Sequence, residues 1–315
     1  MAAEPTLKAS DKQGISKKLI PLLKKQHGSA TPKLELPVLE TILFAICLEN
    51  HSVDDAQELF DRLKHSFCDL NEMRVSSITE LVEVIGDDPE AEHRALRIRS
   101  LLQYVFESSF SYDLEQFIRK TQDQAQKFLN KIPHLSHFVH QFTLLQVLGA
   151  HVIPADADIN QLAVWFGFTS VKSGEEKASD SLKSSVRKSE AALFFYLLRA
   201  ASSDEKLMKK VIKEIEYSEG ENFDLMDAPT RYTNLLAGKA SKKKPVAKTT
   251  KVAAKTTKKA TKKTTGKTAK KTVKKAIPPK PATNKPTKKT AAKTVKKKVV
   301  KAKKKTTPTK KSKKK

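Results

Sequence analysis

Several kinds of residue are scarce in this 315-residue chain, and each scarcity excludes a class of protein. There are two cysteines, Cys47 and Cys68, and neither has a neighbour at metal-ligand spacing, so an iron–sulfur cluster or any other bound cofactor is not expected. No apolar run approaches the roughly 18 residues that a membrane helix needs. The N-terminus lacks the apolar core of a signal peptide. We therefore expect a soluble, intracellular protein.

Acidic residues are missing from the last part of the chain. Residues 239–315 hold 33 of the 61 lysines and arginines, all of them lysine, and none of the 35 acidic residues. The other 28 basic residues stand against all 35 acidic ones, so residues 1–238 carry a net charge of −7, although the whole chain carries +26. A polyanionic partner is therefore expected to bind the lysine-rich segment.

The lysine-rich segment combines lysine pairs with Thr, Ala, Val and Pro and has too little apolar surface to offset its ordering entropy. We expect disorder over residues 237–315. The composition resembles the C-terminal tails of linker histones and of linker-histone-like bacterial proteins. Such a tail binds DNA without sequence preference and with steep salt dependence, because phosphate neutralisation releases counterions; a solubilising tail is the alternative. The lysines expected at DNA include Lys242, Lys243, Lys244, Lys258, Lys259, Lys296, Lys297 and Lys298.

Before the tail, apolar residues recur at helical spacing in one segment after another, and strand patterns are scarce. Capping signals separate the segments; Ser77 and Glu80, for example, form a capping-box pattern that Gly86 follows. We expect an all-α domain of roughly nine to eleven short helices over residues 34–236. Residues 1–33 are polar and mixed, and a flexible segment with at most one short helical turn is expected there.

The stretch from Leu129 to Trp165 is the most informative about function. A helix that ends at Pro133 is followed by a short turn and a second helix, with Ser136 as its N-cap and Gly149 just after its end. Asp156 then precedes another apolar helical run, which places it at a helix N-terminus. The sequence therefore predicts a helix-hairpin-helix layout followed by a carboxylate.

This order of features resembles the helix-hairpin-helix superfamily of DNA glycosylases, which includes endonuclease III and adenine glycosylase. Its members carry a Leu-Pro-Gly-Val-Gly hairpin, a helix, and a catalytic Asp at the start of the next helix. Here Ile132–Ser136 matches the hairpin and Asp156 the carboxylate, and the resemblance runs from about Leu36 to about Ala201. It implies a two-lobed helical fold, DNA as a partner, and base-excision repair as the process.

The resemblance also implies which side chains of the helical domain would contact DNA. His51 falls where the family often has a Gln that wedges into the base pairs. Arg94 lies in a segment that resembles the one before the hairpin, although Arg94, Arg97 and Arg99 also fit a solvated, outward-facing helix surface beside acidic neighbours. The complete implied set is His51, Arg94, His134, Ser136 and His137.

Departures from the family pattern limit the chemistry. Phe138 stands where the bifunctional lyases have a nucleophilic lysine, so a Schiff-base lyase reaction at that position is excluded. His134 and Ser136 replace the two hairpin glycines, and His tolerates a left-handed backbone better than most residues. Asp156 could still orient or deprotonate a water and stabilise an oxocarbenium-like sugar, as in a monofunctional DNA N-glycosylase. A helix cap without catalysis is the alternative.

Three functions remain open at this point. The first is a monofunctional DNA glycosylase that the tail holds on DNA. The second is a non-catalytic, nucleoid-associated protein that binds or compacts DNA through the tail. The third is an interaction module whose acidic domain binds a partner that the tail tethers to DNA. In each case we expect a monomer without membrane contact, located in the cytoplasm at the nucleoid, or in the nucleus of a eukaryote.

Overall fold

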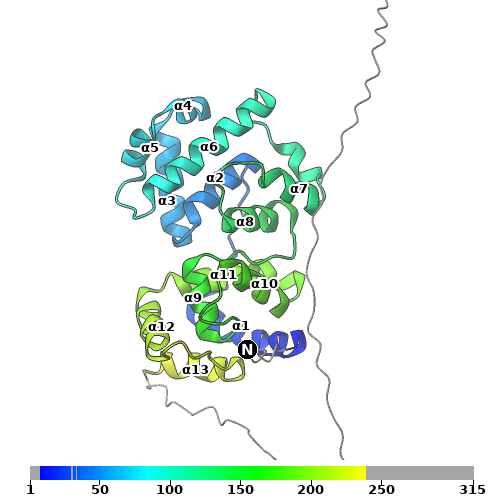
Figure 1. Ribbon diagram of the computed structural model, residues 1–315, viewed down its shortest axis with the longest axis vertical. Coiled ribbons are helices and arrows are strands. Elements are labelled where there is room, and N and C mark those ends of the chain that lie inside the picture. The colour runs from blue at the N-terminus through cyan, green and yellow to red at the C-terminus, as the bar shows by residue number, and fades with distance from the viewer. Residues whose placement is uncertain (1–7, 30, 33, 239–315) are drawn as a thin grey trace, which may run out of the picture. The chain divides into compact units, whose positions relative to one another are not determined.

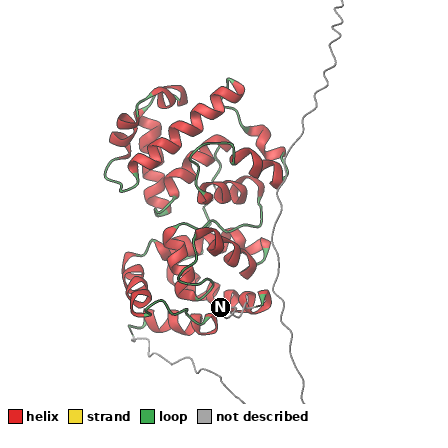
Figure 2. Ribbon diagram, in the orientation of Figure 1, coloured by secondary structure: helices red, strands yellow, loops and turns green. Residues whose placement is uncertain are grey.

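The computed structural model describes residues 8–29, 31–32 and 34–238. Within these residues all regular structure is helical and there is no strand (Figures 1 and 2). The prediction of an all-α domain is confirmed. The chain divides into two compact units, residues 1–246 and 247–315, and everything described below belongs to the first. The lysines predicted to contact DNA, Lys242 to Lys298, lie outside the described residues.

The described chain contains more helices than the nine to eleven expected, because two segments that were read as irregular are helical. None of these helices is both long and apolar enough to cross a membrane. Over the described residues the elements are α1 (Ala9–His27), α2 (Val38–Leu48), α3 (Val53–Ser66), α4 (Leu70–Val75), α5 (Ile78–Ile85), α6 (Ala91–Ser109), the 3-10 helix η1 (Glu115–Arg119), α7 (Gln122–Leu129), α8 (His137–Leu148), α9 (Ala157–Phe166), α10 (Glu175–Ser185), α11 (Lys188–Ser202), α12 (Glu205–Tyr217), the 3-10 helix η2 (Leu225–Asp227) and α13 (Ala228–Leu236).

Helix α2 is the centre of a first group of helices, α2 to α8. It packs against α3, α6 and α8, while α5 packs against both α3 and α6 (Figure 1). Every residue of α2 except Glu40 is buried, which explains why its sequence is apolar on nearly all sides. Cys47 is among the buried residues, as predicted, and burial raises the pKa of its thiol to about 12.

A second group consists of α1 and α9 to α13. Helix α1 packs against α10, α11 and α13. The prediction of a flexible segment over residues 1–33 is therefore wrong for residues 9–27. Ile15, Leu19 and Leu23 recur every four residues and are buried on one face of α1. Pro21 lies inside the same helix on its exposed side, where the missing N–H is tolerated, and it obscured the helical pattern in the sequence.

Two other segments also differ from expectation. The Ser- and Lys-rich sequence of residues 170–185 predicts a connector, but Glu175–Ser185 form α10, which buries small side chains such as Ala178 and Ser179 and therefore lacks a strong apolar pattern. Asp113 predicts the start of a helix that continues towards Leu129, but the structure has η1 followed by α7. Thr121 and Gln124 form a capping box that starts α7 separately.

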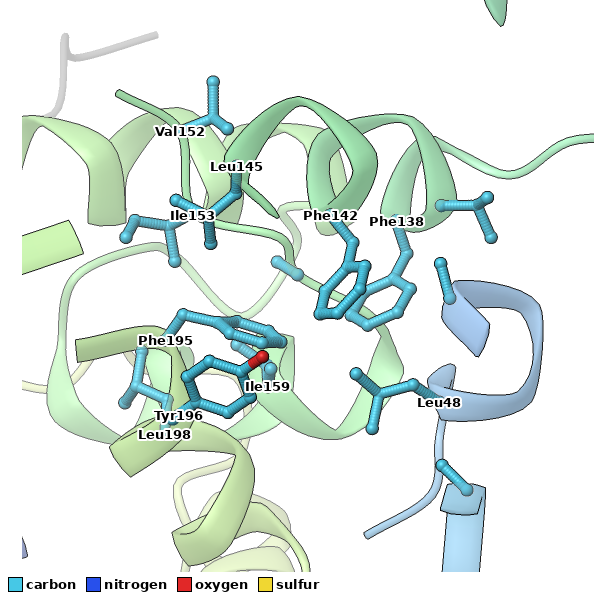
Figure 3. Close-up of a cluster of buried hydrophobic side chains, with 14 of the residues drawn as sticks. Leu48, Phe138, Phe142, Leu145, Val152, Ile153, Ile159, Phe195, Tyr196 and Leu198 are labelled. Atoms are coloured by element: carbon cyan, nitrogen blue, oxygen red, sulfur yellow. The ribbon is translucent and has the colours of Figure 1, made fainter. Parts of the chain in front are cut away.

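Aromatic side chains from both groups meet in one core (Figure 3). Phe138 and Phe142 of α8 are stacked with their ring centroids 6.1 Å apart, and Phe195 of α11 packs edge-on against Phe142 at 5.7 Å. Leu48 of α2 and Ile159 of α9 lie in the same cluster. This core holds the N-terminal ends of α8 and α9 close to α11, and those ends carry the residues that the sequence analysis singled out.

Candidate functional site

The hairpin between α7 and α8 has the predicted order of elements, but its first helix is shorter than predicted. Helix α7 ends at Leu129 rather than at Pro133, and the Ser136 hydroxyl caps α8 by accepting the N–H of Val139 at 3.2 Å. Gly149 ends α8 in a left-handed conformation. His134 has φ +64°, which is the left-handed conformation that a hairpin glycine would otherwise supply, and its side chain is exposed. The turn therefore keeps its shape without glycine.

Basic side chains flank the hairpin. Between residues 119 and 131 there are four basic residues against one acidic residue, Asp123, although residues 1–238 as a whole are acidic. Lys127 and Lys131 are exposed, and the positive end of the α8 dipole lies at the hairpin, where the Ser136 hydroxyl accepts the N–H of Val139. This part of the helical domain has the positive charge that attracts a phosphate group.

Asp156 caps α9, as predicted, and it is buried. Its Oδ1 accepts the N–H of Ile159 at 3.1 Å, while Oδ2 accepts the backbone N–H of Asn50 at 2.9 Å and the guanidinium of Arg199. The side chain is 1% exposed. Donors therefore occupy both carboxylate oxygens, and neither a sugar nor an attacking water reaches them in this conformation.

Arg199 of α11 is the residue that sequence reasoning missed. Its side chain is 1% exposed; besides Asp156 it reaches the carbonyl of His51 at 3.1 Å, and its guanidinium lies 5.5 Å from the centre of the Phe138 ring. The signal in the sequence was an arginine on the same helical face as Phe195 and Tyr196. A cation on a core-facing stripe has to find a buried partner, and Asp156 is that partner.

The position of Arg94 differs from the prediction, which has it on an outward-facing surface and among the DNA contacts. Arg94 is 1% exposed; its Nε donates to Asp88 at 2.7 Å and its guanidinium donates to the carbonyls of Ile46 and Glu49. The last turn of α2 leaves carbonyls without helical partners, and Arg94 satisfies them. The outward placement is wrong, and a buried Arg94 does not contact DNA.

Two other DNA-contact candidates, His51 and His137, lie at or near the surface. The His51 side chain is 25% exposed, with Nδ1 2.9 Å from the Cys47 carbonyl and Nε2 3.7 Å from Asp88. His137 is half-buried at the first position of α8. The structure thus brings His51 close to the Asp156 pair through Arg199, and it places His137 at the hairpin. Their contacts with DNA stay a prediction.

Further carboxyl groups surround Asp156. Burial raises the pKa of Glu49, Asp158 and Glu175, and the negative charge of Asp156 raises each of these pKa values further. Arg97 opposes this effect at Glu49, to which it donates a hydrogen bond, and Arg199 opposes it at Asp158. Burial and the charge of Asp156 therefore both disfavour the ionised form of these three carboxyl groups. Among the described residues, no three His, Cys, Asp or Glu side chains are grouped to hold a metal ion.

No protein-family model and no curated protein sequence matches the chain. Several solved structures match the chain. A trapped covalent intermediate of endonuclease III with DNA has a TM-score of 0.48 and 14% identity, covering 59% of this chain and 84% of that one. A non-covalent endonuclease III–DNA complex has a TM-score of 0.47 and 14% identity, covering 62% of this chain and 85% of that one. The H. pylori 3-methyladenine DNA glycosylase MagIII bound to 1,N6-ethenoadenine has a TM-score of 0.39 and 13% identity, covering 73% of this chain and 96% of that one. These are structures of endonuclease III and of a DNA glycosylase, the kinds of protein that the resemblance in the sequence names.

Proposed function

We propose that the protein binds DNA without sequence preference and that its helical domain is a non-catalytic module with the layout of a DNA glycosylase. The observation that carries this proposal is the state of Asp156, which is buried and shares its carboxylate with Asn50, Ile159 and Arg199. The similarity of the layout to repair enzymes makes base-excision-type repair the process in which such a module would act.

Catalysis by Asp156 would require a large rearrangement. The carboxylate would have to exchange Arg199 for a water and a sugar, and this would leave the Arg199 guanidinium buried without a counterion. Removing one partner from a buried ion pair costs about 3–5 kcal/mol, which is a substantial part of the stability of a typical domain.

Two regions support DNA binding. The first is residues 239–315, whose 33 lysines are point charges that neutralise phosphates without reading bases. The second is the hairpin, where Lys127 and Lys131 are exposed on the chain that leads to the positive N-terminal end of α8. In this proposal the lysine-rich segment supplies most of the affinity, and the hairpin orients the helical domain on the duplex.

A monofunctional DNA glycosylase is the second candidate, and one observation favours it. Asp156 is the N-cap of the helix that follows the hairpin helix, which is where the glycosylase layout has its catalytic carboxylate. In this candidate DNA binding would displace Arg199 and admit the damaged nucleotide.

Base release and DNA binding, measured on the same proteins, separate the candidates. Duplexes carrying uracil, an alkylated purine or an oxidised base are incubated with the full-length protein and then treated with alkali, which cleaves at any abasic site. We expect no cleavage above background. We also expect Asp156→Asn to bind DNA as the wild type does, provided that its unfolding curve shows a folded protein. Base release by the wild type that is lost in a folded Asp156→Asn would establish the glycosylase instead.

Salt dependence tests where the DNA is bound. We expect the full-length protein to show a steep fall of log K with log[salt], and a chain that ends at Gly238 to bind far more weakly. Lys127→Gln and Lys131→Gln should each reduce the slope by about 1, as the loss of one phosphate contact does. Lys209→Gln on the exposed face of α12 is the matched control and should leave the slope unchanged. Equal slopes for the full-length and shortened chains would contradict the proposal.

A further inference from the structure

An apolar hollow lies on the surface between α2, α3 and α4. It has a volume of about 120 Å³, and its floor consists of the buried side chains of Leu43, Phe60, Leu63 and Met73. It shares no lining residue with the surroundings of Asp156. An apolar cavity of roughly 150 Å³ is large enough to bind benzene, so this hollow has room for about one aliphatic side chain.

The rim of the hollow is acidic. Glu40 and Asp69 line it together with Lys64, which forms an ion pair with Glu40 at 2.7 Å. Glu72, in the first turn of α4, accepts the backbone N–H of the lining residue Cys68 and is exposed. Two carboxylates and one ammonium group therefore line the opening, and a third carboxylate lies next to a lining residue, which favours a positively charged ligand.

The charge of the wider surface points the same way. Residues 53–85, which form α3 to α5, contain eight acidic residues, all of them exposed, against three basic ones. Such a surface repels nucleic acid and attracts a cationic polypeptide. A single apolar recess within a charged surface is also the usual setting of an anchor residue at a protein interface.

We propose that this hollow is a docking site for a basic segment of another protein, which inserts one large aliphatic side chain between Leu43, Phe60 and Met73. The lysines or arginines on either side of that anchor lie along Glu40, Asp69 and Glu72. The partner is thus a cationic, apolar-anchored polypeptide, and its site is separate from the DNA-binding regions proposed above.

Methionine methyl NMR of the full-length protein tests the proposal directly. The structure describes three of the four methionines, and of these three Met73 alone lines the hollow, while Met208 and Met226 lie on α12 and η2. The probe is an acetylated, amidated peptide with one Leu between two pairs of Lys. We expect a saturable shift of the Met73 methyl signal with a Kd on the order of 1 mM, and unchanged Met208 and Met226 signals.

Two control peptides separate the contributions of the anchor and the charge. Replacing Leu by Ser should weaken binding by at least about tenfold, because burying a Leu side chain contributes about 1.5–3 kcal/mol. Replacing the four Lys by Glu should abolish the shift. If the Ser peptide binds as tightly as the Leu peptide, no anchor side chain docks and the proposal is overturned. If the Glu peptide binds as tightly as the Lys peptide, the hollow does not select for positive charge, which also overturns the proposal.

Variants of the protein locate the site. Glu40→Gln should weaken the Leu peptide about two- to fivefold, which corresponds to one partly exposed ion pair. Glu83→Gln, which removes an exposed carboxylate of α5 outside the hollow, is the matched control and should have no effect. Leu70→Trp should fill the hollow and prevent binding. If Leu70→Trp does not fold, the peptide controls and the Glu40–Glu83 comparison decide alone, and a Met73 signal that never moves overturns the proposal.

Discussion

The guanidinium of Arg199 and the backbone N–H of Asn50 donate to the same oxygen of Asp156. The Asp156 and Arg199 side chains are each 1% exposed. Bulk water therefore cannot replace either charge as the partner of the other. An ion pair that is so deeply buried contributes little net stability over a well-packed apolar pair, but the loss of one partner is costly. The pair therefore constrains the sequence strongly at both positions.

Arg199→Met should lower the free energy of unfolding by about 3–5 kcal/mol, because it leaves the Asp156 carboxylate buried without its cation. Urea denaturation measures the change. Lys209→Met is the matched control, since it removes a cation from the exposed Lys209–Glu205 pair, and it should cause no measurable change. The double variant Arg199→Met with Asp156→Asn should be more stable than Arg199→Met alone. A strictly additive double variant would show that the two side chains are not coupled.

His140 should make stability depend on pH. Burial and, to a smaller extent, the nearby His137 lower its pKa to about 4, although a backbone hydrogen bond to Leu129 acts in the opposite direction. Between about pH 6.5 and 4 the unfolded chain takes up a proton that the folded protein does not, so the free energy of unfolding falls as the pH falls, by up to about 3 kcal/mol. The stabilisation is fully present above pH 6.5.

The comparison of wild type with His140→Gln isolates this contribution, because the carboxyl groups near Asp156 titrate alike in both proteins. We expect the difference in free energy of unfolding to change between pH 4 and 6.5 and to be constant above pH 7. A difference that is the same at all pH values would show that His140 is not the titrating group.

Gly167 and Gly149 provide a matched pair of backbone tests. Both have positive φ, +83° and +56°, so alanine is strained at either position by about 1–2 kcal/mol. A Cβ at Gly167 would also lie 2.5 Å from the Phe223 carbonyl oxygen and 2.8 Å from the Leu225 nitrogen, whereas nothing lies within 4 Å at Gly149. Gly167→Ala should therefore lower the melting temperature clearly more than Gly149→Ala. Equal effects would mean that the chain around Leu225 moves aside.

Pro21 is expected to weaken α1. It lies inside the helix on the exposed side, where it removes one helical hydrogen bond without filling any core space. Pro21→Ala should raise the free energy of unfolding by about 1–2 kcal/mol, since the gain in helix propensity is partly offset by a more flexible unfolded chain. Lys18→Ala, also exposed on α1, should change stability little. No gain from Pro21→Ala would indicate that the backbone geometry which Pro21 imposes is required for packing.

The elements that could be predicted from the sequence are those whose ends are determined locally. Ser136 and Asp156 cap their helices through their own side chains, and Gly149 ends α8 through its own backbone freedom. Helix α1 was missed because a local rule, that proline interrupts helices, is overridden by the burial of Leu19 and Leu23 against other helices. Helix α10 was missed because it packs through small residues such as Ala178.

The site was less predictable because its decisive contacts are not local. The position of Asp156 at a helix start follows from the sequence, but its burial depends on Arg199, which is 43 residues away. Arg94 reads as a surface arginine until the end of α2 is placed beside it and offers the carbonyls of Ile46 and Glu49. A long cationic side chain with an acidic neighbour can either lie exposed to solvent or be buried with its partner. The tertiary structure alone decides between these two environments.

The contacts of Asp156 also have a consequence for folding. They join residues that are 106 positions apart in the case of Asn50 and 43 in the case of Arg199, while Arg199 in turn reaches His51 across 148 positions. Loops of these lengths have to close before any of the three contacts forms. The two groups of helices should therefore unfold together in one cooperative transition, and the amide hydrogen of Asn50, although it lies in a turn, should exchange with solvent as slowly as those of the central helices.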